Sequence, residues 1–166
     1  GSGGRLIGRR LADDLGIPYY DKELLSRISE ESGFSKEMME EAEMKAKNSF
    51  FYSLSSAFGT GDSGPDSLSL NERFFLAQFD TIRKIADEGS CVIVGRCAGY
   101  VLRGIPGATN IFIYAEKGDK IKRAVEEYNV PEKDVKKVMN DTDKARANYY
   151  NYHTGRKWGD PVNYNL

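Results

Sequence analysis

The sequence is poor in the residues from which many functional sites are built. Its 166 residues include two cysteines, one histidine and five prolines, and 24 basic residues nearly balance 25 acidic ones. The balanced charge gives no overall attraction to nucleic acid or to an anionic membrane, so any anion site has to be local. Cys91, Cys97 and His153 lack the spacing of metal ligands, which argues against a zinc site.

Long apolar runs are also missing. No stretch approaches the length needed to cross a membrane, and no signal peptide is visible. Two cysteines that flank an apolar segment are typical of reduced thiols, so we expect a cytoplasmic protein. At this length we expect one domain, long enough to have its own core.

Glycine, in contrast, is abundant where the chain begins. The first four residues are Gly1, Ser2, Gly3 and Gly4. A helix is predicted to follow and to end at Gly16, with its apolar face formed by Ile7, Leu11, Ala12 and Leu15. A glycine-rich turn before a helix N-terminus suits phosphate, because free N–H groups and the helix dipole point at the same place. The same four residues are also typical of a flexible linker.

Further along, short β-branched segments alternate with amphipathic helices. Strands are expected at residues 17–20, 91–95 and 110–115, and a loop at 59–67. Helices are predicted from Asp21 to Gly33, from Ser35, from Asn71 to Gly89, around residues 120–128, from Pro131, and over 141–150. The strand at 91–95 shows no polar alternation, as expected for a strand buried on both faces of a parallel sheet. The order predicts a three-layer α/β domain, a parallel sheet flanked by helices.

Several charged residues lie where ligands commonly bind. Arg96 comes just beyond the carboxyl end of a predicted strand, where functional residues of open α/β sheets collect. An ordinary surface arginine would explain it too. Asp143 and Arg146 are three residues apart on a predicted helix, so both can reach the same surface, either as a site or as a plain ion pair. The aromatic and basic tail at 152–161 either stacks on a base or packs back on the domain.

Four segments, in this order, resemble the cytidylate-kinase-like branch of the P-loop nucleoside monophosphate kinases. Residues 1–15 resemble the phosphate loop and first helix, and the segment with Asp21 and Arg27 resembles the part that follows the second strand. Residues 95–99 resemble the motif Gly-Arg-Asp-x-Gly, and residues 141–146 resemble the repeated Asp/Arg pattern of the lid. The resemblance covers nearly all of the chain.

The resemblance implies a kinase that uses ATP and Mg²⁺ to phosphorylate a nucleoside monophosphate, such as CMP or dCMP, or a similar small acceptor. Residues 1–166 would form a single P-loop domain with a helical acceptor-binding insertion at about 34–70 and a lid at about 117–158. We expect the first strand of this fold and its C-terminal strand to lie outside the chain. Small-molecule nucleotides are the expected partners.

The resemblance also implies roles for individual residues. Those expected to bind the ATP phosphates are Gly1, Ser2, Gly3, Gly4 and Arg5. Those expected to bind the acceptor are Asp21, Arg27, Arg96, Cys97, Asp143 and Arg146, with Asp143 on the ribose and Arg27 on the acceptor phosphate. The expected catalytic cations are Arg5, Arg96 and Arg146, because a guanidinium grips phosphate oxygens with a planar fork. No protein metal ligand is expected.

The chain departs from the family pattern at three positions. Gly4 stands in place of the lysine of a classical phosphate loop, Leu6 in place of the hydroxyl residue that binds Mg²⁺, and Cys97 in place of an aspartate. Arg5 is the candidate to replace the lost charge.

Two alternatives to a kinase stay open. The first is a regulatory module that binds nucleotide without turnover, which the departures favour. The second is a nucleic-acid-binding module, which the neutral net charge disfavours. Its stacking and basic surface would consist of Tyr149, Tyr150, Tyr152, Arg156, Lys157 and Trp158.

Overall fold

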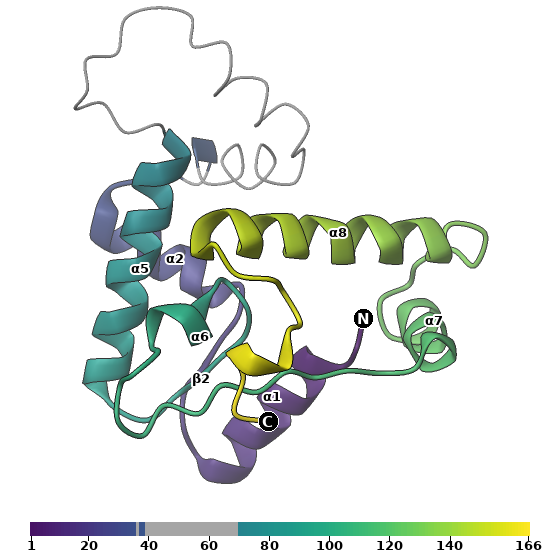
Figure 1. Ribbon diagram of the computed structural model, residues 1–166, viewed down its shortest axis with the longest axis horizontal. Coiled ribbons are helices and arrows are strands. Elements are labelled where there is room, and N and C mark those ends of the chain that lie inside the picture. Colours follow the sequence, from purple (N-terminus) through teal and green to yellow (C-terminus); the bar gives the residue numbers. More distant parts are fainter. Residues whose placement is uncertain (36, 39–69) are drawn as a thin grey trace, which may run out of the picture.

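The computed structural model describes residues 1–35, 37–38 and 70–166 (Figure 1). In chain order the elements are α1 (Gly4–Leu15), β1 (Tyr19–Tyr20), α2 (Glu23–Ser32), α5 (Leu70–Glu88), β2 (Val92–Ile93), α6 (Ala98–Val101), α7 (Lys117–Glu126), α8 (Val135–Thr154) and the 3-10 turn η1 (Pro161–Asn163). The loop predicted at 59–67, and nearly all of the insertion predicted at about 34–70, lie outside the described residues.

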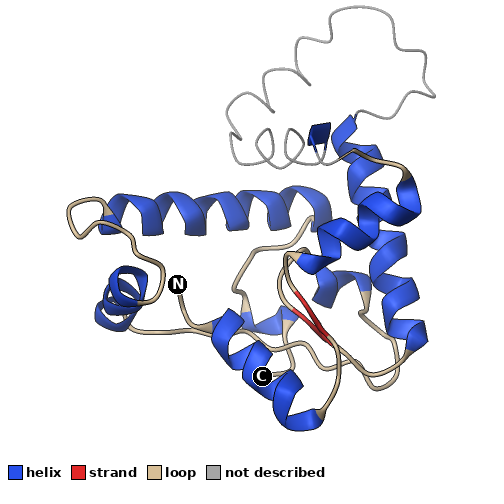
Figure 2. Ribbon diagram, turned by 180° about the vertical axis from the view of Figure 1, so that it is seen from behind, coloured by secondary structure: helices blue, strands red, loops and turns tan. Residues whose placement is uncertain are grey.

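A small parallel sheet forms between β1 and β2, with Tyr19 opposite Val92 and Tyr20 opposite Ile93 (Figure 2). Its two faces carry different helices. Helix α1 packs against the face with Tyr19 and Val92. Tyr20 and Ile93 pack against the core formed by α2, α5 and α6. Helices therefore cover both faces of the sheet, an α/β arrangement as the sequence predicts.

The main core lies between α2, α5 and α6. Its buried members are Leu24, Ile28, Phe34, Phe74, Ile82, Ile85, Ala98 and Val101. A second, smaller cluster of Ala124, Val135 and Met139 joins α7 to α8. Figure 1 shows α8 reaching from α7 at one end of the molecule towards α5 at the other. The α7–α8 segment thus has its own packing, and α8 extends from it towards α5.

The apolar face predicted for α1 is largely wrong. Of its four members only Ala12 is buried. The other three, 42% to 60% exposed, are Ile7, Leu11 and Leu15. The sheet is contacted instead at Gly8, where a Cβ atom would lie 3.0 Å from Val94 Cγ2. A small residue lets the helix come close to the strands, which the spacing of large apolar residues does not reveal.

Two other predicted boundaries differ. Residues 110–115 form no regular strand: Phe112 donates to the Leu166 carbonyl (2.9 Å), and Asn165 and Leu166 donate to that of Asn110 (2.7 and 3.4 Å). The bonds made by Asn110 and Phe112 lie on either side of Ile111, the pattern of one pair of residues in a parallel sheet. A single such pair is too short to form a strand. The helices predicted from Pro131 and over 141–150 are one helix, α8, whose N-cap is Asp134.

Candidate functional site

The N-terminal loop turns into α1 through a left-handed residue. Gly3, the N-cap of α1, has φ 93°, and its carbonyl accepts a hydrogen bond from the N–H of Ile7 at 3.0 Å. No side chain caps this helix end. The first N–H groups of a helix have no partner within the helix and attract anions together with the dipole. The loop therefore has the backbone geometry of an anion site.

Beside this loop lies a pocket of about 210 Å³. Five separate segments line it. They contribute Ser2 of the loop, Phe112–Tyr114, Lys120 of α7, Asp143 and Arg146 of α8, and Trp158 and Gly159 of the tail. The pocket thus brings together three residues predicted from the sequence, Ser2, Asp143 and Arg146. It also adds an aromatic wall and a lysine that the sequence pattern did not single out.

Asp143 holds the two cations of the pocket. Its Oδ2 lies 3.2 Å from Lys120 Nζ, and its Oδ1 lies 3.4 Å from Arg146 Nη1. The side chains of Asp143 and Lys120 are 34% and 20% exposed, so water screens this pair only in part. Two positive charges against one negative charge leave the pocket wall positive, which suits an anionic ligand.

Helix α7 contacts the loop from the other side. Arg123 donates from Nη1 to the carbonyl of Gly1 at 3.1 Å. A Cβ atom on Gly3 would lie 3.1 Å from Arg123 Cζ, so the guanidinium covers the point where a side chain would start. The positive φ favours glycine at this position, and Arg123 would have to shift by a few tenths of an ångström to admit a Cβ atom.

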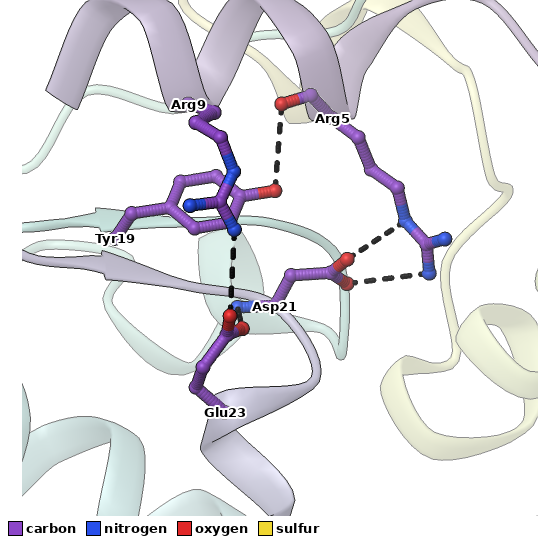
Figure 3. A network of polar contacts seen from close by, with 5 residues as sticks. All are labelled: Arg5, Arg9, Tyr19, Asp21 and Glu23. Atoms are coloured by element: carbon purple, nitrogen blue, oxygen red, sulfur yellow. Dashed lines mark hydrogen bonds and ion pairs between the residues drawn. The ribbon is translucent and has the colours of Figure 1, made fainter. Parts of the chain in front are cut away.

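Arg5 and Asp21 form an ion pair at the junction of α1 with β1 (Figure 3). Arg5 Nε lies 2.8 Å from Asp21 Oδ2, and the side chains are 44% and 15% exposed. The Tyr19 hydroxyl donates to the Arg5 carbonyl, and Arg9 lies over the Tyr19 ring while pairing with Glu23. The structure therefore joins two predicted site residues to each other. Neither lines the pocket.

Arg96 follows β2 in a strained turn. Gly95, Arg96 and Cys97 all have positive φ, 78°, 51° and 58°. This turn is fixed by Gln78 of α5, which is fully buried and donates from Nε2 to the Arg96 carbonyl at 3.0 Å. The Tyr149 hydroxyl of α8 donates to Gln78 Oε1 at 3.3 Å. Non-glycine residues in this conformation persist where surrounding contacts hold them, often at functional sites.

Cys97 is buried, and burial raises the pKa of its thiol to about 12. The side chain at this position is therefore neutral and covered by protein. It does not line the pocket. Next to it, a Cβ atom on Gly99 would lie 2.2 Å from Asn110 Oδ1, so the Asn110 side chain occupies the space that a larger residue would need.

Arg27 is placed apart from the other predicted ligands. Its guanidinium pairs with Glu31 on α2 at 2.6 Å and with Glu88 at the end of α5. The hydrogen bond from Arg27 is the main cause that lowers the pKa of Glu31. Lys84 also pairs with Glu31, at 3.1 Å. Arg27 therefore links α2 to α5.

The tail packs back on the domain and still reaches the pocket. The Trp158 ring meets Phe112 edge to face, with centroids 5.4 Å apart, and the backbone N–H of Trp158 donates to Asn151 Oδ1 at 2.7 Å. Tyr150 is buried, and Arg156 donates a hydrogen bond to Asn163. Tyr150 is therefore not available to a stacking surface, whereas Tyr152 and Lys157 are exposed.

Three residues important to this geometry were missed from the sequence: Lys120, Arg123 and Gln78. Lys120 and Arg123 lie in the helix predicted around residues 120–128, but their position on the loop depends on how α7 packs. The available signal for Gln78 was its position in a predicted helix, three residues after Phe75 and four before Ile82, among apolar residues. Among the described residues, no group of three histidine, cysteine or acidic side chains could hold a metal ion. No helix in the described ranges has the length and apolar character to cross a membrane.

Comparison with known proteins identifies the family. The chain belongs to the cytidylate kinase-like family, whose sequence model matches residues 1–166. The crystal structure of an uncharacterized protein from Eubacterium ventriosum ATCC 27560 is similar, with 31% sequence identity and a TM-score of 0.66. The match covers 99% of this chain and 79% of that one. No curated protein sequence is significantly similar to the chain.

Proposed function

We propose that the protein is a nucleotide kinase that transfers the γ-phosphate of ATP to a nucleoside monophosphate of the CMP or dCMP type, or to a similar small acceptor. One observation carries the proposal: a single pocket joins Ser2 of the glycine-rich loop to Asp143 and Arg146 of α8. Phosphoryl transfer depends mostly on positioning and positive charge, which such a pocket supplies. Membership of the cytidylate kinase-like family supports the same reaction class.

In this proposal the fold is that of the P-loop kinases, with the β1–β2 pair as part of its parallel sheet and the α7–α8 segment as its lid. The N–H groups at the start of α1 and the Ser2 hydroxyl hold donor phosphates. Arg146 holds a phosphate oxygen and Asp143 a ribose hydroxyl. Arg96, in the turn after β2, does not line the pocket, and we propose that it contacts the acceptor. Arg27 would first have to leave its two carboxylates, so we give it no role in the resting geometry.

The residues present fit ATP with Mg²⁺ in a limited way. Mg²⁺ usually binds through one or two protein oxygens, substrate phosphates and water. Ser2 Oγ is the candidate protein oxygen in the pocket, because both oxygens of Asp143 are paired with cations. When bound, the ion neutralises phosphate charge. Most of its ligands would come from the nucleotide and from water.

A second candidate is a regulatory module that binds nucleotide without turnover. Gly4 carries no side chain, Leu6 has no hydroxyl, and Arg5, the expected replacement cation, is already paired with Asp21 at 2.8 Å. These features weaken donor activation but leave the backbone site of the loop intact. This candidate predicts ATP binding with no acceptor-dependent reaction.

Acceptor-stimulated ADP release separates the two candidates. The protein is assayed with ATP and Mg²⁺ against CMP, dCMP, UMP, AMP and GMP, with ATP alone as background. Stimulation by one acceptor supports the kinase and names its substrate. Arg146→Ala should then lose about tenfold to a hundredfold in kcat/KM, as expected for a hydrogen bond to a charged group. Lys136→Ala, which changes an exposed residue on the same helix, should leave kcat/KM unchanged. A flat panel with ATP still bound contradicts the kinase and supports the module.

A further inference from the structure

Position 4 has space for a side chain and holds none. A Cβ atom on Gly4 would make only ordinary contacts, 3.8 Å from Ile113 and 4.0 Å from Ser2 Oγ. In a classical phosphate loop a lysine at this point reaches the β- and γ-phosphates. The neighbouring Arg5 points elsewhere and pairs with Asp21 (Figure 3). Residues 1–5 of the loop therefore place no cationic side chain in the pocket.

Lys120 of α7 brings a cation to the same pocket from the opposite side. Its side chain lines the pocket together with Ser2, and Asp143 holds its amine there at 3.2 Å. The amine also lies 5.7 Å from the centre of the Tyr114 ring. The Lys120 side chain is 20% exposed, so its stem is largely covered while the charged end faces the pocket.

The position of Lys120 relative to the loop is fixed by its neighbour one turn on. Arg123, three residues later on the same helix face, donates to the Gly1 carbonyl at 3.1 Å and packs on Gly3. Helix α7 is therefore attached to the phosphate loop directly. The loop and the amine of Lys120 are held as one unit, although they are far apart along the chain.

We propose that Lys120 is the donor-phosphate cation of this protein, replacing from α7 the lysine that the loop lacks at position 4. The inference rests on the proposed function, since it assumes that the pocket takes ATP. Asp143 then orients two cations, Lys120 and Arg146, towards one ligand. The lid supplies a charge that a classical loop carries itself, so the donor site is complete only when α7 lies on the loop.

A charge-relocation experiment tests the proposal. The variants are Lys120→Met, the double variant Lys120→Met with Gly4→Lys, and the control Lys122→Met, an exposed lysine on the same helix. ATP with Mg²⁺ is titrated while the fluorescence of Trp158 is followed, because this residue lines the pocket and is the only tryptophan in the chain. Acceptor-dependent turnover is measured on the same preparations.

Lys120→Met should weaken ATP binding about tenfold to a hundredfold and lower kcat, the range expected for losing a hydrogen bond to a charged group. Lys122→Met should match the wild type. Gly4→Lys should recover at least a large part of both losses, because it returns the charge to the classical position where the structure has space. Recovery is the result that a merely structural role of Lys120 does not produce.

Three results would overturn the proposal. If Lys120→Met binds ATP as well as Lys122→Met in an active enzyme, Lys120 does not hold the donor, and the proposed function stands without it. If Lys120→Met weakens ATP binding and turnover and the added Gly4→Lys recovers neither, Lys120 acts through packing. If the wild-type protein neither binds ATP nor turns over, the proposed function fails, and this inference fails with it.

Discussion

Replacing Gln78 by leucine tests how the turn that carries Arg96 is held in place. Gln78 is fully buried, and its amide joins three elements: it belongs to α5, donates to the Arg96 carbonyl at 3.0 Å and accepts from the Tyr149 hydroxyl of α8 at 3.3 Å. Leucine keeps the approximate volume and removes both hydrogen bonds. The turn at Arg96, whose φ is 51°, then loses its hydrogen bond to Gln78.

The expected cost follows from the two bonds. Each contributes about 0.5–1.5 kcal/mol net, and leaving a partly buried carbonyl without a partner costs about 1–3 kcal/mol. Together we expect Gln78→Leu to lower the free energy of unfolding by about 2–4 kcal/mol. For a chain of this length that corresponds to a fall in Tm of about 4–16 °C. Tyr149→Phe, which removes only the hydroxyl, should cost about 1 kcal/mol.

Urea denaturation followed by circular dichroism measures these changes. Asp80→Asn is the matched control, an exposed substitution on the same helix that should stay within about 0.5 kcal/mol of the wild type. If Gln78→Leu is as stable as Asp80→Asn, the amide does not hold the turn and the reasoning is refuted. If stability falls as expected, acceptor affinity should fall too in the folded fraction, because Arg96 is no longer fixed.

Two further predictions concern the loop and the aromatic cluster. Gly3→Ala should lower the free energy of unfolding by at least about 1 kcal/mol and weaken ATP binding, because φ is 93° and the new Cβ would lie 3.1 Å from Arg123 Cζ. Gly118→Ala, where nothing lies within 4 Å, should be neutral or stabilising, and equal effects of the two would contradict the account. His153 stacks on Phe75 at 4.1 Å, and burial lowers its pKa from 6.5 to about 4. As pH falls from 6.5 to 4, the imidazole is protonated in the unfolded chain before it is protonated in the folded one. The free energy of unfolding should therefore fall more in the wild type than in His153→Phe. Parallel pH profiles of the two proteins would contradict the burial of a neutral imidazole.

Local signals predicted much of the secondary structure. The β-branched segment around Val92 is a strand, although its regular pairing with β1 covers only Val92–Ile93. Glycines predicted to end helices do so in the left-handed conformation, with φ 65° at Gly16 and 70° at Gly33. These features depend on a few neighbouring residues, so local sequence is enough to specify them.

The packing faces were harder to predict. In α5, Phe74 is buried in the core, whereas the adjacent Phe75 stacks on His153. In α1 the contact with the sheet is made at Gly8 rather than by the large apolar residues. Both outcomes depend on which neighbour each helix meets, and helical periodicity leaves this undetermined when apolar residues are adjacent in the sequence.

The candidate site shows the same division between local and distant contacts. Asp143 and Arg146 pair at the predicted three-residue spacing, at 3.4 Å. Lys120 joins them from 23 residues away, through the packing of α7 on α8, which no local pattern indicates. Arg27 is held by Glu88, 61 residues further on, an ion pair that the sequence could not reveal.

The central claim, phosphoryl transfer to a nucleotide, is tested most directly by following the γ-phosphate itself. ATP labelled at the γ-position is incubated with the protein, Mg²⁺ and the acceptor that most stimulates ADP release, and the products are separated. We predict that the label appears in the nucleoside diphosphate and that Arg146→Ala lowers its rate of formation. Label found only in inorganic phosphate, or only in unreacted ATP, would contradict the account.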